Sequence, residues 1–218
     1  MTDEVLTTLA EKVDLKHAAL IVVDVQNDFC ADGGFFHRTG RDMSMIQPMV
    51  PRLVQFLERT REVGLRTVFI QSTYDERFNS GPMKERNRRR GVEIPRCITG
   101  SWGADFYLVK PQQQEFVVEK HRYSAFAGTK LDLLLRSQGI KTLIMTGVAT
   151  NVCVESTARD GFFLDYYIVF LKDLCATDSQ FLHDATLENI DSLFGVVCTS
   201  AEVLVAWKWP GVVEVPAK

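Results

Sequence analysis

The chain has 218 residues, of which 46% are hydrophobic and 24% are charged, a size and balance that suit one well-packed domain but not two. Its formal net charge of −3 makes no electrostatic case for binding nucleic acid or an anionic membrane. We therefore expect a small neutral or anionic solute as the partner, with no nucleic acid and no membrane.

The cysteines and the N-terminus indicate the compartment. Five scattered cysteines without a Cys-x-x-Cys pair suggest neither a disulfide framework nor a zinc knuckle. The first 17 residues lack the apolar stretch of a signal peptide, and no apolar run reaches transmembrane length. We expect an unexported, cytoplasmic protein.

Strand and helix alternate from the start of the domain. The apolar run 18–25 contains Asp24 near its end, as in a central parallel strand that carries a polar residue at its carboxyl end. The chain is expected to divide into an N-terminal arm, one domain and a C-terminal tail, over residues 1–17, 18–206 and 207–218. A loop, a helix and a second strand are expected over residues 27–40, 45–63 and 65–71.

The segment 72–111 has no strong period and is rich in charges, Gly and Pro. Such a long connection in a compact domain is typical of a functional loop or lid. The basic run Lys84–Arg90 lies within it and is offset by acidic residues elsewhere. A solvated face or a subunit contact is favoured over a phosphate site for this run.

The alternation continues after Lys120, which a strand over 115–119 delivers. Further helices and strands are expected over residues 124–137, 142–145, from 150, 166–171, 184–194, 196–199 and 201–206. About six strands and five helices predict an α/β fold, with three α-β-α layers around a doubly wound, mostly parallel sheet.

Cys153 follows a strand and a tight turn at Gly147, and the pair Thr150–Asn151 offers N-cap side chains before it. In the first turn of a helix, unpaired N–H groups and the helix dipole favour a thiolate, and the same groups can hold an oxyanion. A nucleophile is one interpretation of Cys153, and a small buried hydrophobic residue is the other. Spacing alone does not choose between them.

Three separated motifs resemble those of a known family. GVATNVCVESTARDG around Cys153 resembles the nucleophile motif of the isochorismatase-like cysteine hydrolases, and LIVVDVQNDFC and FVVEKHRYSAF supply the family's Asp24 and Lys120. The resemblance runs from about Ala19 to Val203 in the family's order. The chain is identified as a member, and the resemblance implies a homo-oligomer.

The resemblance also implies a mechanism. Asp24 is expected to act as general base, Lys120 to stabilise the thiolate, and Cys153 to attack an amide or ureido carbonyl. The backbone N–H groups of Ala149 and Cys153 are expected to receive the oxyanion, after a cis peptide bond between Val148 and Ala149. Because the carboxyl ends of parallel strands share one rim, the three side chains can converge there.

Two features bear on the branch of the family. The metal ligands of nicotinamidases, an Asp-x-His pair and a further His, have no counterpart in CADGGFFH or QSTYDERFNS, where His37 is alone. No metal and no cofactor are therefore expected. GVATNVCVESTARDGFFLDYY with KHRYSAFAGT looks closest to the ureidoacrylate amidohydrolases, which implies a ureido or amide substrate. Biuret, N-carbamoylsarcosine and other small-amide hydrolases remain alternatives, as does a non-catalytic binding protein.

The expected substrate pocket combines residues that flank the strand ends with residues of the long connection. These candidates are Asn27, Phe29, Phe35, Tyr74, Trp102, Tyr123 and Phe126. Either Arg77 or Arg122 is a candidate for pairing with a substrate carboxylate through its planar guanidinium.

Overall fold

The computed structural model describes residues 5–92 and 95–210. Its six parallel strands form one sheet in the order β3-β2-β1-β4-β5-β6. In chain order they are β1 Ala18–Val23, β2 Arg66–Ser72, β3 Phe116–Lys120, β4 Thr142–Val148, β5 Tyr167–Ala176 and β6 Val196–Cys198. The central strands β1 and β4 are buried at every residue, as strands covered on both faces must be.

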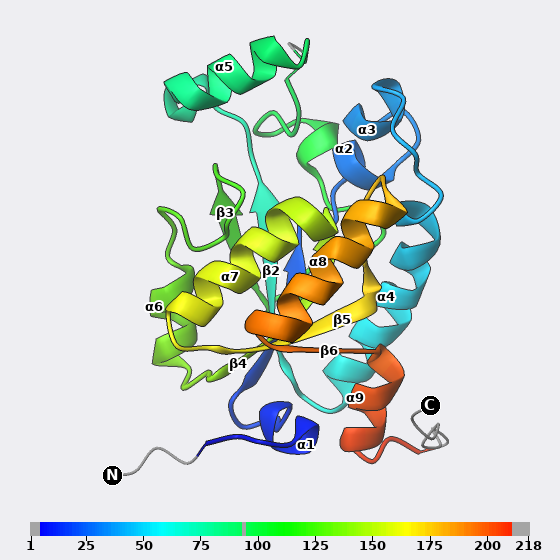
Figure 1. The fold of residues 1–218 in the computed structure, drawn as a ribbon, viewed down its shortest axis with the longest axis vertical. Helices are drawn as coiled ribbons and strands as arrows, with labels where there is room; N and C mark the ends of the chain where they lie inside the picture. The colour runs from blue at the N-terminus through cyan, green and yellow to red at the C-terminus, as the bar shows by residue number, and fades with distance from the viewer. Residues whose placement is uncertain (1–4, 93–94, 211–218) are drawn as a thin grey trace.

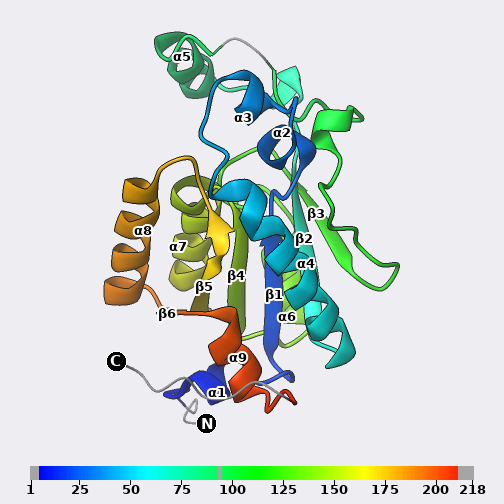
Figure 2. The ribbon, with the colours of Figure 1, turned by 90° about the vertical axis from the view of Figure 1, so that its right-hand side faces the viewer.

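Helices cover both faces of the sheet (Figures 1 and 2). One layer comprises α4 Ile46–Glu62 and α9 Ser200–Ala206, and the other comprises α6 Leu131–Ser137, α7 Glu155–Phe163 and α8 Gln180–Leu193. The predicted three-layer, doubly wound fold is therefore confirmed. No helix among the described residues combines the length and apolar character needed to cross a membrane.

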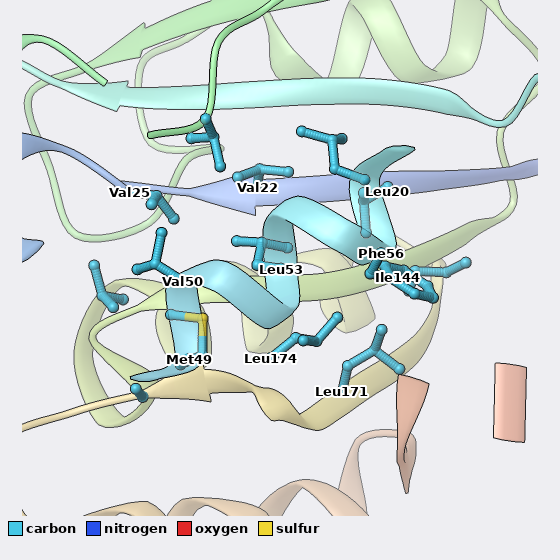
Figure 3. Packing of buried hydrophobic residues seen from close by; sticks show 14 of the residues in the cluster. Leu20, Val22, Val25, Met49, Val50, Leu53, Phe56, Ile144, Leu171 and Leu174 are labelled. Carbon is cyan, nitrogen blue, oxygen red and sulfur yellow. The ribbon is translucent and has the colours of Figure 1, made fainter. Parts of the chain in front are cut away.

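The core on the α4 side is built from alternate residues of β1. Leu20 and Val22 point to α4, where Met49 and Leu53 are fully buried against them (Figure 3). The neighbouring β1 residues Ala19, Ile21 and Val23 belong to the opposite cluster, with α6, α7 and α8. Because successive side chains of a strand point to opposite faces, β1 packs against both helical layers at once.

The strand order reverses between β1 and β4. The chain moves outward from β1 to β3 and then returns to place β4 beside β1. Gly147 permits this close pairing at its carboxyl end, because a Cβ there would lie 2.1 Å from the Val23 carbonyl oxygen and its φ is +113°. Crevices at such reversals are where open α/β sheets bind ligands.

Three short helices lie where the sequence predicted loops or no regular structure. The segment 27–40 forms α2 Asn27–Cys30 and α3 Phe35–Arg38, and the long connection contains α5 Gly81–Arg89. The Asp28 carboxylate joins these regions, accepting hydrogen bonds from the backbone N–H of Phe35 and of Cys97. Tertiary contacts therefore stabilise segments whose own pattern is weak.

Other boundaries also differ from the prediction. The helix expected over 124–137 begins only at Leu131, and the weak helical pattern of the N-terminal arm yields only α1 Leu9–Lys12. In the predicted tail, Trp207 stacks on Phe56. Residues 1–4 and 211–218 of the arm and tail lie outside the described residues, and the three-part division of the chain stays a prediction.

Candidate active site

Asp24, Lys120 and Cys153 meet at the carboxyl edge of the sheet. Asp24 directly follows β1, Lys120 is the last residue of β3, and Cys153 lies just after β4. The Lys120 Nζ is 2.7 Å from Asp24 Oδ2 and 3.5 Å from Cys153 Sγ. Asp24 is fully buried and the Lys120 side chain is only 1% exposed. The sheet therefore unites a carboxylate, an ammonium and a thiol that lie far apart in the sequence.

The turn at Asp24 takes the chain out of β1. Its backbone has φ +52°, a left-handed conformation that is uncommon for a residue other than glycine and costs on the order of 1 kcal/mol or more. The backbone N–H of Asp24 donates to Ile70 of β2, and the Asp24 carbonyl accepts from Gln26. These bonds hold the carboxyl group at the strand end despite the local strain.

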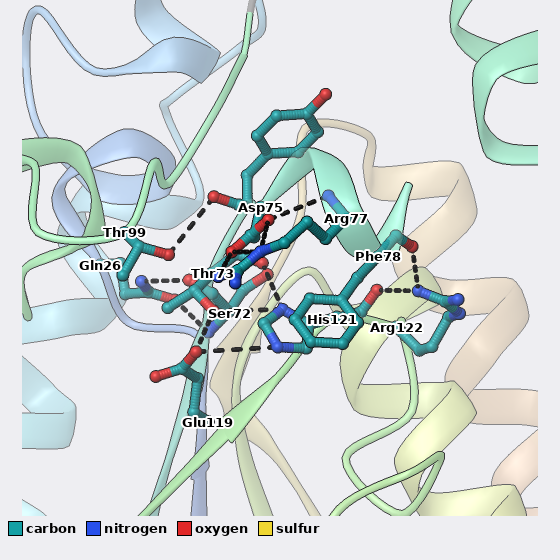
Figure 4. Close-up of polar contacts among 11 residues, drawn as sticks. Gln26, Ser72, Thr73, Asp75, Arg77, Phe78, Thr99, Glu119, His121 and Arg122 are labelled. Carbon is teal, nitrogen blue, oxygen red and sulfur yellow. Dashed lines mark hydrogen bonds and ion pairs between the residues drawn. The ribbon is translucent and has the colours of Figure 1, made fainter. Parts of the chain in front are cut away.

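A polar network joins the ends of β1, β2 and β3 (Figure 4). The Gln26 side chain donates to the Ser72 carbonyl at 2.9 Å and accepts from the Ser72 N–H at 2.8 Å. The Thr73 hydroxyl donates to Glu119 at 2.7 Å, and His121 Nδ1 lies 3.1 Å from the Thr73 carbonyl. The strand that carries Asp24 is thereby tied to the strand that carries Lys120.

Besides Asp24 and Cys153, the Lys120 ammonium contacts a backbone carbonyl. Its Nζ donates to the Arg122 carbonyl at 2.9 Å. The Arg122 guanidinium in turn donates to the Phe78 carbonyl, and the Phe78 ring stacks on His121 at 4.0 Å (Figure 4). The buried ammonium thus occupies a site with an acceptor for each of its three protons.

The turn before Cys153 differs from the prediction. Thr150–Val154 forms a single wide turn of π-helix before α7 begins at Glu155. Thr150 and Asn151 do not cap this helix, since the Thr150 hydroxyl is bonded to His183 and the Asn151 side chain accepts from Thr177. Hydrogen bonds to α8 and to the residue after β5 therefore use the side chains that the local sequence predicts as caps.

The Val148–Ala149 peptide bond is cis, as the resemblance implied. Ala149 and Cys153 both line the cavity described below. Within residues 5–92 and 95–210, no acceptor is bonded to the Ala149 N–H. This N–H is therefore available to an oxygen in the cavity.

Burial is the largest single influence on the pKa of each of the three groups, although at Lys120 the combined effect of its neighbours exceeds it. Burial raises the pKa of the Asp24 carboxyl, and the nearby charge of Lys120 opposes that rise. Burial alone lowers the pKa of the Lys120 ammonium, but Asp24 and Cys153 outweigh it, so the pKa is raised. A hydrogen bond with the Cys153 thiol also favours the charged form of Asp24. Lys120 is thus held charged beside both the carboxyl group and the thiol.

Cys153 is not a preformed thiolate. Burial raises the pKa of its thiol to about 12, although the charge of Lys120 opposes this. The expectation of a favoured thiolate is wrong for the resting protein, because burial and the neighbouring Asp24 outweigh the charge of Lys120. The thiol must therefore lose its proton to a neighbouring group as it reacts.

A cavity of about 500 Å³ opens over Cys153. Four of the predicted pocket residues line it, namely Phe29, Phe35, Tyr74 and Tyr123. The other three lie elsewhere. Asn27 donates its side-chain amide to the Trp102 carbonyl, Trp102 is 54% exposed, and Phe126 stacks on Tyr166. The cavity volume is in the usual range of small-molecule sites, roughly 300–1,000 Å³.

Apart from Arg122, the arginines of this cavity are the feature that sequence reasoning missed. Six arginines line it, namely Arg41, Arg86, Arg89, Arg90, Arg96 and Arg122. Three belong to the basic run that was interpreted as a solvated face or subunit contact. Ser80 and Pro82 were the available signal, because Pro in the first turn after an N-cap Ser is typical of a helix start.

The two arginines that were proposed for a carboxylate are already engaged. Arg77 does not line the cavity and forms an ion pair with Asp75. Arg122 lines the cavity, but its guanidinium donates to the carbonyls of Phe78 and His121. Among the described residues, no cluster of three or more His, Cys, Asp or Glu side chains is arranged to hold a metal ion.

A buried carboxylate, ammonium and thiol at the reversal of a parallel sheet define a site suited to cysteine chemistry on a small molecule. A family model described as the isochorismatase domain matches residues 18–202. The chain belongs to this family.

Known proteins show the same relationship. Ureidoacrylate amidohydrolase RutB of Enterobacter sp. (strain 638) is 38% identical over 203 residues, which cover 86% of this chain and 87% of the relative. An isochorismatase-like hydrolase from Alkaliphilus metalliredigens is 31% identical with a TM-score of 0.72, covering 88% of this chain and 99% of that one. A cysteine hydrolase from Pseudomonas syringae pv. phaseolicola 1448A is 25% identical with a TM-score of 0.79, covering 95% and 99%.

Proposed function

We propose that this protein is a cysteine-dependent amidohydrolase that cleaves a linear C–N bond of a small ureido compound of the ureidoacrylate type. The observation that carries the proposal is the position of the Lys120 ammonium, 2.7 Å from Asp24 and 3.5 Å from the Cys153 sulfur. The similarity to a ureidoacrylate amidohydrolase over most of both chains supports the substrate class.

The first half of the reaction breaks the C–N bond. Asp24 accepts the thiol proton as the Cys153 sulfur bonds to the ureido carbonyl carbon, and Lys120 stabilises the developing thiolate. The tetrahedral intermediate then collapses, Asp24 returns the proton to the departing nitrogen, and the amine leaves. A carbamoyl group remains on Cys153 as a thioester.

The second half releases this group. Asp24 takes a proton from water, whose oxygen bonds to the carbamoyl carbon. The C–S bond breaks, carbamate leaves, and the proton returns to the Cys153 sulfur. Both halves need a base with a raised pKa, and the first half starts from a protonated thiol, which agrees with the directions of the Asp24 and Cys153 pKa shifts.

The oxyanion of both tetrahedral intermediates is proposed to accept hydrogen bonds from the backbone N–H groups of Ala149 and Cys153. The unbonded state of the Ala149 N–H in the described structure supports this role. Losing one donor of this kind typically costs about 10²- to 10³-fold in kcat.

Two further candidates remain. Hydrolysis of biuret, N-carbamoylsarcosine or another small amide would use the same three residues, and only the far end of the substrate would differ. A non-catalytic binding protein has no need of a base, an ammonium and a thiol within bonding distance of one another. That arrangement favours the enzyme over the binding protein.

The test is a comparison of ureidoacrylate, N-carbamoylsarcosine and biuret with the ureido carbon isotopically labelled. We expect wild type to release labelled carbon dioxide fastest from ureidoacrylate, and Cys153→Ala to lower kcat by at least ~10⁴-fold. If no ureido compound is cleaved, the enzyme assignment fails. If biuret is the best substrate, only the ureidoacrylate assignment fails.

We also propose that the enzyme is a homo-oligomer of the cytoplasm, with no nucleic-acid or membrane partner. Five free thiols fit a reducing compartment, and the net charge of −3 offers no attraction to polyanions. Sedimentation as a 24.7 kDa monomer would contradict the homo-oligomer.

A further inference from the structure

The arginines of the cavity are not equivalent. Arg41 forms an ion pair with Asp178 at 2.9 Å, and Arg89 forms one with Glu85 four residues earlier on α5. Arg122, as described above, donates to two backbone carbonyls. These three guanidinium groups therefore already have acceptors of their own.

Arg90 also lines the cavity, but its side chain is exposed. Arg86 and Arg96 differ from these four. Both are half-buried and line the cavity with Cys153, and no carboxylate among residues 5–92 and 95–210 forms an ion pair with either. Arg86 donates to the side chain of its neighbour Asn87, which carries no charge. Two positive charges thus line a concave cavity, in which water screens them less than on a flat surface.

Each of these guanidinium groups lies over an aromatic ring of the cavity wall. Arg86 is 5.8 Å from the ring centroid of Tyr123, and Arg96 is 5.5 Å from that of Phe35. Such contacts orient the planar group and leave its edge donors for another acceptor. Tyr123 follows β3 and Phe35 belongs to α3, so the two arginines are supported by different elements of the wall.

These charges also influence the pKa values of neighbouring groups in the site. Burial lowers the pKa of Arg86, and the positive charges of Arg96, Arg90 and Arg41 lower it further, although Tyr123 opposes them. Burial raises the pKa of Asp24, and Arg96 is among the charges that oppose the rise. The guanidinium of Arg96 therefore lies within electrostatic reach of both Arg86 and the catalytic carboxyl group.

We propose that Arg86 and Arg96 form an anion-binding subsite that holds the carboxylate of the substrate while Cys153 attacks its ureido carbonyl. This inference rests on the proposed function, and it names the residues that distinguish an anionic ureido acid from a neutral ureido compound. A carboxylate can accept paired hydrogen bonds from a guanidinium edge, and the two arginines supply both its charge partners and its orientation.

The position of α5 places Arg86 away from the two helical layers of the domain. The helix lies beyond the carboxyl ends of the strands, apart from both helical layers, and none of its residues is buried (Figures 1 and 2). Binding energy from the remote carboxylate can therefore hold α5 over the cavity and fix the ureido group against Cys153. Interactions with a part of the substrate that does not react are a recognised source of orientation at the reacting bond.

The test compares ureidoacrylate with its primary amide, in which a neutral group of similar shape replaces the carboxylate. Wild type, Arg86→Ala, Arg96→Ala and Arg88→Ala are assayed at pH 8 by release of carbon dioxide from a labelled ureido carbon. Arg88 is the matched control, because it lies on α5, carries the same charge, is exposed and does not line the cavity.

We expect Arg86→Ala and Arg96→Ala each to lower kcat/KM for ureidoacrylate by at least ~30-fold, and to change kcat/KM for the amide by less than about 3-fold. Retained cleavage of the amide shows that the variants fold. Arg88→Ala should change neither value. Arg86→Lys should recover only part of the loss, because lysine keeps the positive charge but lacks the paired N–H donors of a planar guanidinium.

Equal losses for both substrates, or an undiminished kcat/KM for ureidoacrylate in both alanine variants, would overturn the subsite. The hydrolase itself would then stand, provided that wild type cleaves ureidoacrylate and Cys153→Ala does not. If wild type cleaves neither compound, the proposed function and the subsite fall together.

Discussion

The buried pair of Asp24 and Lys120 permits a quantitative prediction about stability. Both side chains are almost completely removed from solvent, and their charged atoms are 2.7 Å apart. Removing one partner of such a pair typically costs about 3–5 kcal/mol, because the other charge remains buried without compensation. We therefore expect Asp24→Asn and Lys120→Met each to lower the free energy of unfolding by about 3–5 kcal/mol at pH 8.

The double variant Asp24→Asn/Lys120→Met retains neither charge. Its remaining penalty is that of a buried amide with incomplete hydrogen bonding, about 1–3 kcal/mol. The loss in the double variant should therefore be smaller than the sum of the two single losses by at least about 3 kcal/mol. A cycle of four urea denaturation curves measures this coupling.

The pH dependence of Lys120→Met gives a second measurement. Burial raises the pKa of Asp24 above its ordinary value of 3.8, and loss of the Lys120 charge raises it further. A group with a higher pKa in the folded than in the unfolded state favours folding at pH values below its unfolded-state pKa. This contribution is lost as the pH rises through its folded-state pKa. The destabilisation of Lys120→Met relative to wild type should therefore be smaller at pH 5 than at pH 8.

Additive effects in the cycle, to within about 0.5 kcal/mol, would refute this reasoning. So would a Lys120→Met variant whose deficit is the same at both pH values. Either result would mean that water reaches the pair and screens it.

Three further predictions follow from the site. Brief iodoacetamide treatment should label Cys153 first, because it is half-buried on the cavity wall while the other four cysteines are buried. The labelling rate should rise with pH, since the pKa of the thiol is about 12. Earlier labelling of Cys30 in a peptide map would contradict this. The acid limb of kcat/KM should lie above pH 3.8, since burial raises the pKa of Asp24, and Arg96→Ala should move the limb to higher pH while Arg88→Ala leaves it in place. Exhaustive treatment with EDTA should leave turnover unchanged, and activity that is lost with EDTA and restored by one metal would overturn the expectation of no metal.

The order of strands and helices along the chain could be predicted from the sequence, because buried parallel strands appear as continuous apolar runs. The apolar runs of β1 and β4 indicated a sheet buried on both faces, and the residues after such strands share one edge. Asp24, Lys120 and Cys153, which the family resemblance indicated, each end or follow a predicted strand, so a shared rim could be predicted for them. The resemblance to a family added the implied cis bond before Ala149, which no spacing pattern predicts.

Side-chain partners and protonation were decided only by the tertiary structure. Thr150 looked like a helix cap but is bonded to His183 of α8, which lies 33 residues away. Cys153 looked like a thiolate, but the desolvation that raises its pKa depends on what the fold packs around it. Arg86 was interpreted as part of a solvated face or subunit contact because its basic run is short and offset by acidic residues elsewhere, but the fold places it on the cavity wall. Local sequence records which groups a segment offers, whereas burial and long-range packing determine which of them meet and in what charge state.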